Sequence, residues 1–213
     1  MNTKIFSALL AIAALLVAGC NCAVNRSLRV EDGERVTGGL TTVNGTIRIG
    51  EDAEVMGTSR TVNGRITVDD GARVGGLATV NGAVEIARNV AVDGDVETVN
   101  GRAACGSGTE VRGDVSTVNG SIRLEATRVD GRVVTYNGEV TLRDGSRVRR
   151  DVVIERSRGP SWPNRPLDIR ILQGSVVEGD IVVKTKRRPV TVYIAEGSEV
   201  LGEIRNAKVV RQS

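Results

Sequence analysis

Short stretches of alternating apolar and polar residues recur along most of the chain. In each stretch a polar or small residue separates two apolar ones, as in residues 47–49 (IRI) and 66–68 (ITV). The six apolar pairs are Ile47 and Ile49, Ile66 and Val68, Val84 and Ile86, Ala103 and Cys105, Ile122 and Leu124, and Val140 and Leu142. This alternation predicts strands with one buried face and one solvent-exposed face.

The motif Thr-Val-Asn-Gly precedes each of these stretches, with Tyr in place of Val in the sixth copy at residues 135–138. Its asparagines follow one another at steps of 19, 18, 19, 19 and 18 residues: Asn44, Asn63, Asn81, Asn100, Asn119 and Asn137. A fixed period in this range indicates stacked structural repeats. We expect the stacked asparagine side chains to bond one another as a structural ladder.

A second corner, Val-x-Gly, lies between consecutive copies of the motif, as in residues 36–38 and 92–94. At this corner and at Asn-Gly, glycine is expected to supply the positive φ that a tight turn needs. The apolar positions of one copy, Val36, Leu40, Val43, Ile47 and Ile49, are all expected to face the interior.

These patterns predict an all-β fold, a right-handed parallel β-solenoid (β-helix) of about eight turns of 18–19 residues. One copy alone buries too few apolar side chains to offset the entropy lost on ordering it, so copies must stack and pair in parallel. Uneven steps between apolar positions favour the right-handed type over left-handed hexapeptide solenoids. A β-sandwich or a propeller fits less well, because propeller blades are about twice as long as this repeat.

The first 19 residues have the features of a targeting segment: Lys4, then an apolar run over residues 5–17, then small residues before Cys20. At about 15 residues the apolar run is short for a membrane span, which needs about 20. Residues 17–20 (VAGC) resemble a bacterial lipoprotein signal, which implies cleavage before Cys20 and diacylation of this cysteine. An uncleaved anchor and an ordinary signal peptide are the alternatives.

The resemblance places the chain in the bacterial cell envelope, lipid-anchored at the periplasmic face or the outer membrane. Asn21 stands where an aspartate would retain an enterobacterial lipoprotein at the inner membrane, which favours the outer membrane. The expected organisation is a signal peptide (1–19), a lipid-anchored tether (20–27) and a single solenoid domain (28–213). Cys105 is expected to fill a small buried apolar position, with a disulfide to Cys22 as the alternative.

Two insertions interrupt the repeat after Val148, both at the corner that Asn-Gly occupies in earlier turns. They span residues 156–166 and 184–189 and are expected to protrude side by side. Their candidate partner-binding residues are Trp162, Arg156, Arg158, Arg165, Lys184, Lys186, Arg187 and Arg188. A basic patch with one aromatic side chain suits an anionic envelope component, such as lipid headgroups or an acidic protein face. The alternative is a pair of solvated loops.

The composition argues against catalysis. The chain has no histidine, and no GxSxG, CxxC or HExxH motif occurs in it. We therefore expect no catalytic residue, no metal and no cofactor. A column of acidic residues is interrupted by Arg132 and lacks the several oxygen ligands that calcium needs. Its members are Asp95, Asp114, Asp151, Asp180 and Glu203.

The charge and the aromatic content argue against nucleic acid as a partner. The formal net charge is +3, and it falls to +2 when the signal segment with its single lysine, Lys4, is removed. A nearly neutral chain does not attract a phosphate backbone. Aromatic residues make up 2% of the chain and leave almost nothing for bases to stack on.

The sequence V-x-G-D-V or V-x-G-D-I, in residues 92–96, 111–115 and 177–181, resembles the repeats of bactofilins, as does the GA-x-V corner at residues 71–74. The resemblance covers residues 36–204 and implies a right-handed β-helix that assembles end to end without nucleotide. The Thr-Val-Asn-Gly motif is also similar to repeats of adhesin-like bacterial solenoids. The lipoprotein signal and the corner insertions depart from the bactofilin pattern.

The leading hypothesis is a non-enzymatic scaffold that is held at the membrane by its lipid anchor and associates end to end with itself. The first alternative is a monomeric adhesin-like module that binds a glycan or an anionic surface through the two insertions. A polysaccharide-active enzyme is a remote alternative that rests on fold-level analogy alone.

Overall fold

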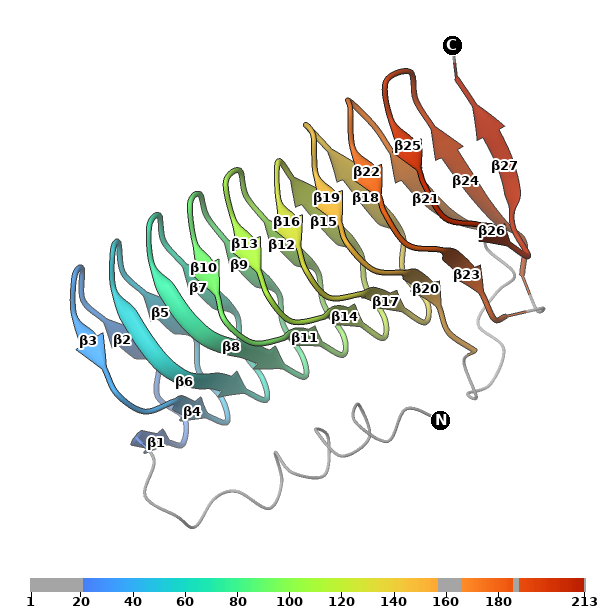
Figure 1. The fold of residues 1–213 in the computed structure, drawn as a ribbon. Helices are drawn as coiled ribbons and strands as arrows, with labels where there is room; N and C mark the ends of the chain where they lie inside the picture. Colours follow the sequence, from blue (N-terminus) through green and yellow to red (C-terminus); the bar gives the residue numbers. More distant parts are fainter. Residues whose placement is uncertain (1–20, 157–165, 186–187, 213) are drawn as a thin grey trace.

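The structure, a computed structural model, describes residues 21–156, 166–185 and 188–212. This part of the chain contains no helix, and its 27 strands stack in parallel as a β-solenoid of about nine turns. The layers follow one another along one axis, with the first and last strands at opposite ends (Figure 1). The predicted class, a parallel β-solenoid, is confirmed.

The first of two sheets takes one strand from each layer and contains the predicted alternating stretches. Its strands are β2 (Leu28–Val30), β5 (Ile47–Ile49), β7 (Ile66–Val68), β9 (Val84–Ile86), β12 (Ala103–Cys105), β15 (Ile122–Glu125), β18 (Val140–Arg143), β21 (Leu167–Ile171), β24 (Val190–Ile194) and β27 (Lys208–Arg211). Equivalent residues stack in register, with Ile47 beside Ile66 and Ile49 beside Val68. These inward side chains are fully buried.

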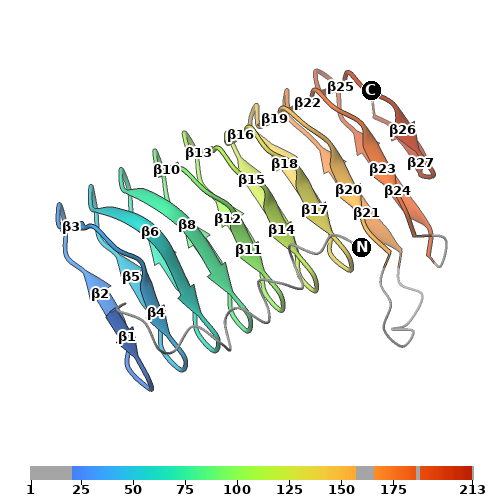
Figure 2. The ribbon, with the colours of Figure 1, turned by 60° about the horizontal axis from the view of Figure 1, so that its bottom comes forward.

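The second sheet has 17 strands, turns at the Val-x-Gly corner and forms the rest of the solenoid's wall (Figure 2). Eight of its strands precede the Asn-Gly corner or its equivalent, and in the regular layers they end in the motif's threonine. They are β1 (Asn21–Ala23), β4 (Leu40–Thr42), β11 (Val96–Thr98), β14 (Val115–Thr117), β17 (Val133–Thr135), β20 (Val152–Ile154), β23 (Ile181–Val183) and β26 (Ile204–Arg205). The short strands at Val-x-Gly are β3 (Arg35–Val36), β10 (Ala91–Val92), β13 (Glu110–Val111), β16 (Arg128–Val129), β19 (Arg147–Val148), β22 (Val176–Val177) and β25 (Glu199–Val200). In β6 (Glu54–Thr61) and β8 (Arg73–Thr79) the two segments run on as one strand.

The threonine of the repeat motif, and not its valine, faces the core. Leu40 and Thr42 are the buried residues of β4, so the alternation of the strand turns Val43 outward and leaves it partly exposed. The expectation that Val43 faces the interior is therefore wrong. The Thr61 hydroxyl donates to the Gly45 carbonyl of the preceding layer at 2.9 Å, which satisfies a polar group in an apolar interior.

The glycine of Asn-Gly is needed for a reason other than the one predicted. None of the Asn-Gly or Val-x-Gly glycines has a positive φ. A Cβ at Gly101 would instead overlap the carbonyl oxygen of Gly82 in the preceding layer, and the other Asn-Gly glycines are equally confined. Positive φ occurs at the third corner, between the two sheets, for example at Gly71 and Gly108. Close stacking of layers thus selects glycine at the Asn-Gly corner.

The stack begins within the segment predicted as a tether. Strand β1 pairs in parallel with β4, placing Asn21 opposite Leu40 and Ala23 opposite Thr42. Asn25 also accepts a hydrogen bond from Asn44 in the next layer. Of the predicted tether 20–27, these residues therefore belong to the first layer of the rod.

We predict that Gly101→Ala lowers the free energy of unfolding by more than about 3 kcal/mol, because the new methyl group forces two backbone-paired layers apart. The measurement is urea unfolding followed by circular dichroism. The matched control is Gly38→Ala, since a Cβ at Gly38 meets nothing within 4 Å and its φ is not positive. Equal effects of the two substitutions would contradict the steric explanation.

Candidate functional site

The Asn-Gly corner carries a continuous ladder of side-chain amides along the rod. In each layer the Asn Nδ2 donates to the Oδ1 of the asparagine in the preceding layer. The bonds from Asn44, Asn63, Asn81, Asn100, Asn119 and Asn137 measure 2.6, 2.7, 2.8, 2.9, 2.8 and 2.8 Å. Every link points the same way, so each amide acts as both donor and acceptor. The ladder fixes the lateral position of each layer on the next.

Two residues at the ends of the ladder were not assigned to it from the sequence. Asn25 is the first acceptor, and its position 19 residues before Asn44 was the available signal. Arg188 is the last donor, because its Nη2 lies 2.5 Å from the Asn137 Oδ1. Arg188 was predicted to contact a partner, but in the structure its guanidinium closes the ladder where the Asn-Gly sequence stops.

Of the other described residues of the predicted basic patch, Lys184 forms an ion pair and Arg156 is exposed to solvent. Lys184 Nζ lies 2.7 Å from Glu155 Oε1, so its charge is largely matched within the chain. Arg156 is exposed. Nearby, burial and then the charge of Glu155 raise the pKa of Tyr136, which replaces the motif's valine in the last regular layer. Of this cluster, Arg156 is the side chain best placed to meet a partner.

Several predicted site residues lie outside the described part of the chain. They are the lipidation site Cys20 and the insertion residues Arg158, Trp162, Arg165, Lys186 and Arg187. The connections that carry the insertions follow β20 and β23, in adjacent layers at the Asn-Gly corner. The predicted surface is thus represented here by Arg156, Lys184 and Arg188.

The acidic column acts as a second ladder at the Val-x-Gly corner. Asp95 Oδ1 accepts the backbone N–H of Asp114 at 2.8 Å, and Asp114 Oδ1 accepts that of Arg132 at 2.8 Å. The Arg132 side chain also pairs with Asp114 at 2.7 Å. Arg132 has no side-chain acceptor for the next layer, so it interrupts the column as expected, and the series resumes where Asp151 Oδ1 accepts the Asp180 N–H at 3.0 Å. These carboxylates are occupied by backbone donors of the next layer.

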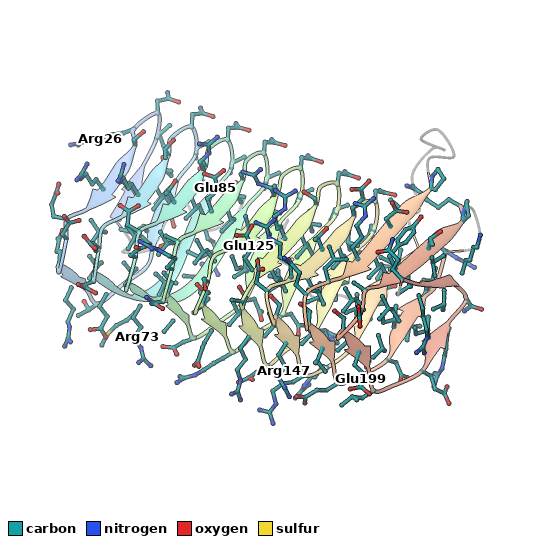
Figure 3. All side chains as sticks on the ribbon, turned by 90° about the horizontal axis from the view of Figure 1, so that it is seen from above. Arg26, Arg73, Glu85, Glu125, Arg147 and Glu199 are labelled. Atoms are coloured by element: carbon teal, nitrogen blue, oxygen red, sulfur yellow. The ribbon has the colours of Figure 1, made fainter. Side chains whose placement is uncertain are left out.

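Outward side chains along the rod pair between layers. Figure 3 shows Arg73 and Arg147 along one edge of the rod and Glu85 on the opposite side. Asp93 binds Arg73 at 2.9 Å and Arg112 at 2.5 Å. Exposed ion pairs of this kind contribute about 0–1 kcal/mol each to the free energy of unfolding, so they add little to the cohesion of the layers.

Two titratable side chains show the effect of burial. Burial raises the pKa of Glu97, on the outer face of β11, and the charge of nearby Asp95 raises it further. Burial alone raises the pKa of the free Cys105 thiol to about 12. Cys105 stacks between Ile86 and Leu124 in an inward column, in the manner of a small apolar residue.

Within the described residues, no group of three or more histidine, cysteine, aspartate or glutamate side chains is placed to hold a metal ion. In the same part of the chain, no helix is long and apolar enough to cross a membrane. The asparagine ladder at the Asn-Gly corner holds the layers in position, and the same corner places basic side chains at the surface of the rod.

A scan against protein-family models and searches among curated proteins and solved structures gave no match. By its geometry, the chain is a parallel β-solenoid protein whose layers are joined by an amide ladder at one corner and a carboxylate ladder at another.

We predict that Asn81→Asp lowers the free energy of unfolding by about 2 kcal/mol at pH 7. The introduced carboxylate still accepts from Asn100 but faces the Asn63 oxygen without a proton to donate. Protonation restores the donor, so folding raises the pKa of this carboxyl, and the deficit shrinks as the pH falls below that pKa. The measurement is urea unfolding at pH 7 and at about pH 4.

The control for this substitution is Asn89→Asp, at the third corner. Asp52 and Asp144 already occupy that corner with the same positive φ in other layers. Asn89→Asp is expected to change stability by less than about 0.5 kcal/mol at either pH. A pH-independent loss in Asn81→Asp would contradict the donor role of the ladder amide.

Proposed function

We propose that this chain is a non-enzymatic, envelope-anchored β-solenoid lipoprotein that acts as a structural scaffold and associates end to end with itself. The observation that carries the proposal is the open edge at each end of the stack. Among the described strands, β2 pairs only with β5, and β27 pairs only with β24. Unpaired strand edges are templates for another strand.

Apolar side chains at both ends support association. Leu28 and Val36 at the N-terminal end are only partly buried, as are Val200 and Ile204 at the C-terminal end. Val209 in the last strand is 40% exposed. A second copy placed on either end would remove this apolar surface from water, which favours contact by about 25 cal/mol per Å².

The position of the first strand supports an anchor at one end of the rod. Asn21 follows the predicted lipidation site Cys20 and begins β1 in the first layer. A lipid on Cys20 would therefore attach at the N-terminal end of a rod whose layers are fixed by hydrogen-bonded ladders. The sequence resemblance to bactofilins supports the same assembly mode.

The competing function is a monomeric module that binds an anionic surface at the corner insertions. The exposed Arg156, next to two connections in adjacent layers, favours it. The ion pair of Lys184 with Glu155 offsets one positive charge, and the hydrogen bond to Asn137 occupies one of the donors that Arg188 could offer a ligand. On the described residues, self-association is therefore the better-supported function.

We predict that the purified full-length chain in mild detergent forms end-to-end dimers and longer rods that increase with protein concentration. The reason is that each copy has two open ends and no symmetry that closes the assembly. Sedimentation velocity and negative-stain imaging measure it. A particle that remains a single rod at all concentrations would contradict self-association and direct attention to the Arg156 corner.

A further inference from the structure

One outward row of side chains is valine in six consecutive layers. It consists of the residue that follows the buried threonine of the motif, together with Val24 at the equivalent position of the first layer, since β1 pairs in register with β4. The Val99 N–H donates to the Thr79 carbonyl of the preceding layer, so the row follows the stacking of the rod. Tyr136 takes the next position. The valines are Val24, Val43, Val62, Val80, Val99 and Val118.

These valines reach solvent although they are apolar. Val24 is 61% exposed, and the other five are partly exposed. Strand propensity alone does not require valine here, because an outward row of the first sheet uses Arg48, Thr67 and Glu85 in successive layers. A contiguous apolar surface of this kind is typical of an interaction site.

The neighbouring outward row, which runs from Thr41 to Val153, adds little polar surface. Its only charged members are Arg60 and Glu97. Burial raises the pKa of the Glu97 carboxyl, so the charged form of this side chain is disfavoured. The members that are 3 to 6% exposed are Ala78, Ser116, Val134 and Val153. The two rows together are called the valine face, and Figure 2 shows its strands β4, β11, β14 and β17 side by side along the rod.

The predicted lipid anchor is attached at one end of the valine face. Cys20 directly precedes β1, and Val24 directly follows it. Because so few residues separate the lipid from the face, the bilayer is present there at a high effective concentration, and a contact that is weak between free partners is then sufficient. A bilayer offers an apolar interior below polar headgroups, which suits a row of valines followed by a tyrosine.

An upright rod, standing on its N-terminal end, fits the membrane less well. Charged side chains of both signs are exposed there and would lose hydration against the bilayer. An upright rod would also cover the open edge of β2, which end-to-end association needs. A rod that lies on its valine face leaves both ends free. The charged residues at the N-terminal end are Arg29, Glu31, Asp32, Glu34 and Arg35.

We propose that the rod lies along the membrane on its valine face, with the bilayer surface as a second attachment beside the lipid anchor. This inference rests on the proposed lipid anchor and adds the orientation of the rod. The valines leave water at the boundary between headgroups and acyl chains, while the exposed Arg156 at the adjoining corner meets anionic headgroups. Rods held in this way can join end to end in the plane of the membrane.

The test places a single tryptophan on either side of the rod and measures its quenching by brominated lipids. Trp162→Phe first removes the only tryptophan from the full-length lipidated protein, which is reconstituted in vesicles of phosphatidylethanolamine and phosphatidylglycerol. Val99→Trp lies on the valine face, and Thr67→Trp, at an outward and partly exposed position of the first sheet, is its control. Quenching of Val99→Trp is expected to exceed that of Thr67→Trp at least about threefold, because only the first side chain reaches the acyl boundary.

Carboxylates introduced on the valine face give an independent check. Val80→Glu with Val118→Glu, in the Val99→Trp chain, is expected to lower quenching to the level of Thr67→Trp, because an ionised carboxylate at the acyl boundary loses hydration. Ala104→Glu with Thr141→Glu, at outward positions of the first sheet, is the matched control and leaves the quenching of Val99→Trp unchanged.

Each outcome supports or overturns the proposed orientation. Weak quenching at both positions would indicate an upright or detached rod, and equally strong quenching a rod without a preferred face. Emission from Val99→Trp that shifts to the blue with protein density, without quenching, would assign the valine face to a second copy. All three results overturn the proposal.

Mass spectrometry of Cys20 separates this failure from failure of the proposed anchor. A lipidated chain without preferential quenching keeps the anchor and loses the orientation, whereas an unmodified Cys20 removes both. Should Val99→Trp fail to fold, as judged by circular dichroism, Val62→Trp replaces it in the same row.

Discussion

The distance of about 4.8 Å between backbone-paired layers is the constraint on which the rest of the molecule depends. At that distance there is no room for a Cβ at Gly101, so the corner needs glycine. The Thr61 hydroxyl reaches the carbonyl of the layer below, and the Asn81 amide reaches Asn63. The glycine, threonine and asparagine of the repeat are thus each required by contacts between layers and not by contacts within one layer.

Much of the fold could be predicted because it repeats. The alternation of apolar and polar residues predicted the strands, and the step of 18 or 19 residues between motifs predicted the stacking of layers. The inward position of Thr42 was missed, since hydrophobicity alone favours Val43, and the hydroxyl's carbonyl partner lies in another layer. Arg188 was missed as part of the ladder because its partner, Asn137, lies 51 residues away across a corner insertion. Contacts between layers are visible in the sequence only where they repeat.

The two ladders explain how a surface rich in charge remains an ordered rod. Amides bond along one corner, and carboxylates bond backbone N–H groups along another, while exposed ion pairs add little. The amide ladder is closed by Arg188 within the rod, whereas the backbone pairing of the sheet ends at the open edges of β2 and β27. The strand pairing that holds neighbouring layers together within one chain is therefore available between chains, which connects the fold to the proposed scaffold function.

The central claim is that the layers are equivalent units held by a common spacing, and deletion of one complete layer tests it most directly. Removing residues 83–101 joins Gly82 to Arg102 and keeps every column in register. The account predicts a cooperatively folded rod, shorter by about 4.8 Å in small-angle scattering, whereas removal of residues 83–91 shifts the register and unfolds the chain. Unfolding of the full-layer deletion to the same extent as the half-layer deletion would contradict it.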